Sequence, residues 1–220
     1  DKELSQSAAR YLQDCGVLDR IFKESYLNDQ AELERNYTLL HNALNVNVAG
    51  FLSDLKSISE PGSLLLASRL LEEAGPRSSI TALAKRVFSQ NEKDKLDSEK
   101  IEIYRNTLGC IQNRGNDQSF MLLADEMTNI RDNGNLLKET LLHLPRRGSE
   151  YFMPVLKHFL QDPTFTLYEE LRSAFLQMDE TSVFDLVMDI LKKGRDVYSH
   201  MVRIQALKIL GEMKSEVCLQ

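Results

Sequence analysis

Residues 150–176 read EYFMPVLKHFLQDPTFTLYEELRSAFL, two apolar runs separated by Asp162-Pro163. Apolar residues in each run recur three and four positions apart, which is the period of an amphipathic α-helix. Proline stops a helix because its ring removes one N–H donor and clashes with the preceding turn. The stretch therefore predicts two helices joined by a short turn at Asp162-Pro163.

The next stretch, residues 182–211, reads SVFDLVMDILKKGRDVYSHMVRIQALKILG and has the same organisation. Val183, Val187 and Ile190 share one helical face, and Gly194 marks a break before a second helix. Residues 118–149 also predict a helix pair, so the period is about 32 residues. One such pair cannot bury its apolar face alone, and stacking on neighbouring pairs, as in an α-solenoid, would bury it.

Helical signals extend along the whole chain, and no stretch shows the apolar alternation of strands. Thr166 to Glu169 and Ser182 to Asp185 resemble capping boxes and predict helix starts at those positions. The expected helices are 3–14, 17–26, 30–44, 47–58, 63–74, 79–90, 98–112, 118–130, 135–144, 150–161, 166–178, 182–193 and 198–213.

Two segments resemble a known family, the HEAT repeats. Residues 202–211 read VRIQALKILG and are similar to the family's second-helix pattern Val-Arg-x-x-Ala-x-x-Ala-Leu-Gly, with Ile209 in place of an alanine. Residues 153–156 read MPVL and, with the later Asp162-Pro163, are similar to the first-helix core and its turn. Weaker copies occur around Leu108-Gly109 and after Gly75-Pro76.

The resemblance implies an all-α fold, a right-handed α-solenoid of antiparallel helix pairs. Small Ala206 would allow close helix approach, and Gly211 would suit a helix end. We expect a helical cap or divergent repeat over 1–46 and a HEAT-like array over 47–220, strongest at 118–213. The alternative is an irregular helical bundle with accidental periodicity.

The amino-acid composition restricts the classes of protein to which this chain can belong. The chain has 220 residues, 42% hydrophobic and 27% charged, with net charge −6 and no tryptophan. A substantial core is therefore expected, whereas the acidic balance disfavours nucleic-acid binding. Cys15, Cys110 and Cys218 form no disulfide framework, which favours a reducing, cytoplasmic location. No membrane span or signal peptide is evident, and a start at Asp1 is compatible with a fragment of a larger protein.

No catalytic or metal-binding motif is present. The four histidines form no HExxH pattern and no zinc-ligand spacing with cysteine, and no phosphate-binding glycine loop occurs. His158 is expected to be a packed or surface histidine and Cys110 a core thiol. Glu72-Glu73 and Glu169-Glu170 are expected on solvated helix faces. We therefore expect no enzymatic activity, no metal and no cofactor.

Solenoids usually bind partners along the wall formed by their second helices. Projecting the sequence at 100° per residue nominates six polar positions opposite the buried stripe. Their mixed charges suit a protein or peptide partner, or a neighbouring domain, although ordinary solvated surface is the competing interpretation. The positions are Glu102, Arg105, Lys138, Glu169, Arg172 and Lys208.

Two functions are compatible with these features of the sequence. The first is a non-enzymatic scaffold or docking domain for proteins, without nucleic-acid or membrane binding. The second is a HEAT-like nucleic-acid binder or DNA glycosylase-type enzyme, a class that this fold resembles. The latter needs a basic surface and stacking aromatic side chains, and the acidic composition counts against it.

The expected C-terminal helix poses a further question. Ile204 and Leu207 project away from its buried stripe, and the residues after Gly211 are too few for another helix pair. This end could continue into further repeats or self-associate through the last helix. Alternatively, both side chains tuck between adjacent second helices.

Overall fold

The computed structural model describes residues 61–73, 77–89 and 98–213, together with Ser7 and Tyr11. Over these residues every α-helical prediction is confirmed and no strand occurs, so the described part of the chain is all-α. The expected helices at 17–26, 30–44 and 47–58 lie outside the described residues, as does nearly all of 3–14. The expected cap over 1–46 lies outside them too, apart from Ser7 and Tyr11.

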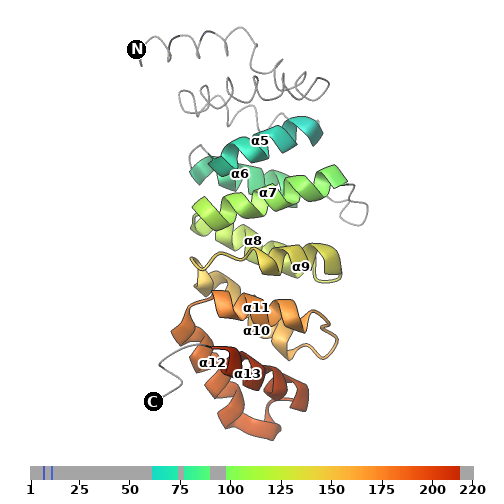
Figure 1. The fold of residues 1–220 in the computed structure, drawn as a ribbon, viewed down its shortest axis with the longest axis vertical. Coiled ribbons are helices and arrows are strands. Elements are labelled where there is room, and N and C mark those ends of the chain that lie inside the picture. The colour runs from blue at the N-terminus through green and yellow to red at the C-terminus, as the bar shows by residue number, and fades with distance from the viewer. Residues whose placement is uncertain (1–6, 8–10, 12–60, 74–76, 90–97, 214–220) are drawn as a thin grey trace. The chain divides into compact units, whose positions relative to one another are not determined.

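The described helices agree with the nine predicted from 63–74 onward, each end falling within two residues of its expected position. A short 3₁₀ segment, η2 (Gly194–Asp196), follows α12 at the glycine break that the sequence indicated. The α-helices, drawn in Figure 1, are α5 (Pro61–Glu73), α6 (Arg77–Phe88), α7 (Ser98–Arg114), α8 (Asp117–Asn129), α9 (Gly134–Leu142), α10 (Ser149–Gln161), α11 (Tyr168–Gln177), α12 (Glu180–Lys193) and α13 (His200–Glu212).

The chain divides into two compact units, residues 1–122 and 123–220. In the first unit α7 packs against both α5 and α6. Leu70, Leu83 and Leu108 are fully buried there, one from each of the three helices. Gly109 marks the close approach of α7 to α5, because a Cβ at this position would lie 2.7 Å from Glu72 Oε1.

The second unit is built from consecutive helix pairs. Helix α10 packs on α11 and α12 packs on α13, while α11 also contacts both α9 and α13. The second helix of each pair therefore lies against the second helix of the pair before it, and we call α9, α11 and α13 the second helices. Phe152, Phe159 and Phe175 fill the core, and Ala206 is fully buried, as its small size suggested.

Two predicted capping boxes are wrong. Helix α11 starts at Tyr168 after the N-cap Leu167, which makes no side-chain cap, so the hydroxyl of Thr166 is not the cap. Helix α12 is capped three residues earlier than expected, because Asp179 accepts hydrogen bonds from Ser182 N at 2.9 Å and Ser182 Oγ at 2.8 Å. Asp and Ser are both favourable N-cap residues, and here the carboxylate binds the amide of Ser182 itself, so Ser182 lies inside the helix.

Candidate functional site

Each second helix of the second unit exposes one leucine in its C-terminal half. Leu142, Leu176 and Leu207 are 41%, 41% and 55% exposed, although their helices also supply core residues. Because α11 contacts both α9 and α13, these leucines belong to adjacent helices. We call Leu142, Leu176 and Leu207 the leucine face. Isolated exposed leucines are common, but one exposed leucine on each of three neighbouring second helices is a pattern.

A cation precedes each of these leucines by four residues. Residues four apart lie on the same side of a helix, so cation and leucine are neighbours on each one. The cations are Lys138 on α9, Arg172 on α11 and Arg203 on α13. Lys138 and Arg172 are two of the residues predicted to bind a partner, and Arg203 is one that the projection missed.

Lys138 is paired within the protein. Its Nζ lies 2.8 Å from Glu170 Oε1 on α11, and Glu170 is the less exposed of the two. The hydrogen bond with Glu170 raises the pKa of Lys138, and the same bond lowers the pKa of Glu170. The projection chose Glu169 instead of Glu170, because a single-helix projection does not show which carboxylate faces the preceding helix.

Arg172 is buried, at 9% exposure, and it connects α11 to α13. It forms an ion pair with Glu169 on its own helix, and its Nε lies 3.2 Å from Glu212 Oε1. Its Nη1 also donates to Gln205 Oε1 at 3.3 Å. The predicted residues Glu169 and Arg172 thus come together, in a network that joins the last two second helices.

Helix α13 presents a different electrostatic surface. Lys208 is exposed, and among the described residues neither Lys208 nor Arg203 has a carboxylate partner. At 100° per residue, Leu207 and Ile204 lie next to each other around the helix axis, with Arg203 on one side of them and Lys208 on the other. Nothing lies within 4 Å of a Cβ added at Gly211, so the surface is open beside them. The helix therefore shows an apolar ridge between two positive charges.

The remaining predicted residues lie on α7 in the first unit. Glu102 forms an ion pair with Arg69 of α5. Arg105 is exposed and also has an interaction within the structure. Arg69 was not predicted, although it stands 33 residues before Glu102, close to the 32 residues that separate Lys138 and Glu170. A search for opposite charges one repeat apart could have found both pairs.

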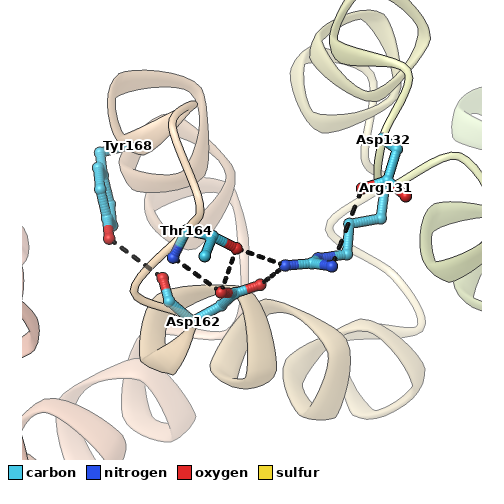
Figure 2. A network of polar contacts seen from close by, with 5 residues as sticks. All are labelled: Arg131, Asp132, Asp162, Thr164 and Tyr168. Atoms are coloured by element: carbon cyan, nitrogen blue, oxygen red, sulfur yellow. Dashed lines mark hydrogen bonds and ion pairs between the residues drawn. The ribbon is translucent and has the colours of Figure 1, made fainter.

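A second polar network braces the turns at the start of α9 and α11 (Figure 2). Asp162 Oδ1 accepts from Thr164 N at 2.9 Å and from Thr164 Oγ1 at 2.7 Å. Arg131 donates to Asp162 Oδ2 and to Thr164 Oγ1, and Tyr168 Oη donates to the Asp162 carbonyl at 3.3 Å. Hydrogen bonds from Thr164, and then from Arg131, lower the pKa of Asp162. This network holds the turns in place.

Cys110 and His158 lie as the sequence suggested. Cys110 is buried, and burial raises the pKa of its thiol to about 12, as for a core cysteine. His158 is exposed, with its ring centroid 6.3 Å from that of Phe159. Across the described ranges no three His, Cys, Asp or Glu side chains are placed to hold a metal ion. Nor does any described helix have the length and apolar character needed to cross a bilayer.

No protein-family profile, curated protein or solved structure matches the chain.

Proposed function

We propose that this protein is a non-enzymatic interaction scaffold, a right-handed α-solenoid of HEAT-like antiparallel helix pairs that binds another protein on its second helices. The repeated exposure of Leu142, Leu176 and Leu207 carries the proposal. A stripe of leucines crossing successive helices offers apolar area to a partner, whereas single leucines scattered over a surface do not. The cysteine pattern supports a reducing, cytoplasmic setting.

The chemistry of α13 defines the partner more closely. Arg203 and Lys208 flank the ridge of Ile204 and Leu207, and neither has a carboxylate partner among the described residues. An amphipathic helix with an apolar stripe and acidic residues along both edges complements this surface. We therefore propose an acidic amphipathic helix of another protein as the occupant of the leucine face.

Ion pairing argues against a nucleic acid in the same place. Lys138 and Arg172 face carboxylates at Glu170, Glu169 and Glu212, so their charges are already matched. Phosphate binding would require breaking those pairs, and the net charge of −6 repels a polyanion at long range. Sub-micromolar duplex DNA binding with a steep salt dependence would replace this proposal with the nucleic-acid alternative.

The test compares two variants with substitutions at exposed positions. A photoreactive amino acid at Ser173, exposed on α11, would crosslink the partner in the source cell, and the purified partner would then be titrated against each variant. The double variant Leu176→Ser/Leu207→Glu should weaken binding at least tenfold. Met121→Ser is the matched control, because Met121 is 54% exposed but lies on α8.

Equal binding by the parent and the double variant would contradict the proposal. Light scattering on the unliganded parent provides a second discriminating measurement. A dimer that dissociates in the Leu207→Glu variant would identify a second copy as the occupant, in place of another protein.

A further inference from the structure

A pocket of about 460 Å³ lies in the first unit, between α6 and the start of α8. Its volume is within the range of small-molecule sites. Each kind of polar lining group occurs twice, and no carboxylate is among the described lining residues. The hydroxyls are Ser78 and Thr81, the cations Lys85 and Arg86, and the amides Asn116 and Gln118.

Hydrogen bonds fix the orientation of the Asn116 carboxamide. Its Oδ1 accepts from Thr81 Oγ1 at 3.0 Å and from Ser119 N at 3.0 Å. The Asn116 backbone N–H in turn donates to Ser119 Oγ at 2.8 Å, a reciprocal cap for α8. Because Oδ1 is engaged twice, the Nδ2 amino group is the part of this side chain that remains available to a ligand. The cap therefore presents a donor at the pocket.

Two positively charged side chains line the same pocket as this donor. Lys85 is exposed and has no carboxylate partner among the described residues, whereas Arg86, which also lines the pocket, has an interaction of its own within the protein. Ser78 and Gln118 supply further donors, and the N-terminal end of α8 contributes its partial positive charge. Asp117, the first residue of α8, is not part of the pocket lining. The site thus offers donors and cations, which is the chemistry that an oxyanion requires.

The charge and the size of the pocket restrict the class of ligand that it can bind. Lys85 and the neighbouring donors match an anionic head group, and phosphate monoesters, which are close to doubly charged at neutral pH, are such a group. The pocket is larger than a bare phosphate needs, and Ala82 with the aliphatic stems of Lys85 and Arg86 provides apolar lining. We propose that this pocket binds a phosphate monoester carried on a small apolar body, a function separate from that of the leucine face.

Calorimetric titration with phenyl phosphate tests the site. The parent should bind it saturably, and Lys85→Gln and Asn116→Asp should each weaken binding at least tenfold. Asn116→Asp keeps the acceptor for Thr81 and Ser119 and remains a good helix cap, but it replaces the amino group with negative charge. Lys192→Gln, on α12 and outside the pocket lining, should bind like the parent. Unfolding curves would show that all three variants fold.

Other outcomes overturn the proposal. These are the absence of saturable binding at millimolar phenyl phosphate, equal binding of benzyl alcohol, or unchanged affinity in both pocket variants. A short peptide containing phosphotyrosine presents the same head group, and its affinity relative to phenyl phosphate shows whether a protein or a small molecule supplies it. Lys85→Gln should leave partner binding at the leucine face unchanged. The phosphate-binding proposal and the partner-binding proposal are therefore tested independently of each other.

Discussion

Arg131 and Asp162 form an ion pair although they stand 31 residues apart, in the turns that precede α9 and α11 (Figure 2). Arg172 and Gln205 form a similar link between α11 and α13, with a separation of 33 residues. The hydrophobic effect that holds the apolar stripes of neighbouring helices together is non-directional. Directional polar contacts between consecutive pairs fix their relative position.

Removing the charge of Asp162 should make stability less dependent on pH. Its folded-state pKa is lowered by hydrogen bonds from Thr164 and Arg131, so it stabilises the fold above the unfolded-state pKa of about 4. That contribution is lost as the pH falls through the lower folded-state pKa. Asp162→Asn should thus destabilise the protein at pH 7, and the difference from the parent should shrink below about pH 4.

Urea unfolding measured from pH 7 down to pH 3 checks this expectation. Asp132→Asn is the matched control, because the Asp132 side chain is 97% exposed and lies 3.8 Å from the same arginine. The two variants behaving alike at every pH would show that the Asp162 network adds no measurable stability.

Replacing each of two glycines with alanine should change the free energy of unfolding in opposite directions. A Cβ at Gly115 would lie 2.4 Å from the Ile111 carbonyl oxygen and 2.6 Å from the Phe120 ring, whereas one at Gly211 would meet nothing within 4 Å. Gly115→Ala should cost about 1–3 kcal/mol through overpacking. Gly211→Ala, inside α13, should stabilise by about 0.5–1 kcal/mol because alanine is the better helix former. Unfolding curves that move in the same direction would refute this assignment.

The aromatic core of the second unit should be sensitive to truncation. Phe159 is fully buried and stacks on Phe165 with ring centroids 5.1 Å apart. Phe159→Ala should lower the free energy of unfolding by about 3–5 kcal/mol, because a large cavity remains. Leu176→Ala, on the exposed leucine face, should cost far less. Denaturant titrations giving similar losses would mean that the leucine face is part of the core.

The helices were predictable because their signals are local. The period of Val183, Val187 and Ile190 and the break at Asp162-Pro163 depend only on nearby residues, and both are confirmed. The cap of α12 was wrong by three residues because Asp179 and Ser182 are both common N-cap residues, and the pattern alone does not decide at which of them the helix begins.

The site was less predictable because its members come from different helices. The projection found Lys138 and Arg172, but it could not show that Glu170 and Gln205 on neighbouring helices hold them. The pocket at Asn116 was missed entirely. It depends on contact between α6 and the cap of α8, and only a turn was visible at that position in the sequence.

Substitutions at Ile204 and Leu207 distinguish an exposed apolar ridge on α13 from side chains that pack between the second helices. Leu207 is 55% exposed, whereas Ile204 is half-buried, so one of the two side chains contributes packing and the other very little. Leu207→Glu should change the free energy of unfolding by no more than about 0.5 kcal/mol, as for other surface positions. Ile204→Glu should cost clearly more, because it moves a charge to a partly apolar site. Urea titration of both variants, with light scattering for oligomeric state, provides the measurement. Large and equal losses would show that both side chains pack between second helices, leaving no apolar ridge on α13 for a partner. A stable Leu207→Glu protein that no longer binds the partner would instead locate the binding surface at this leucine.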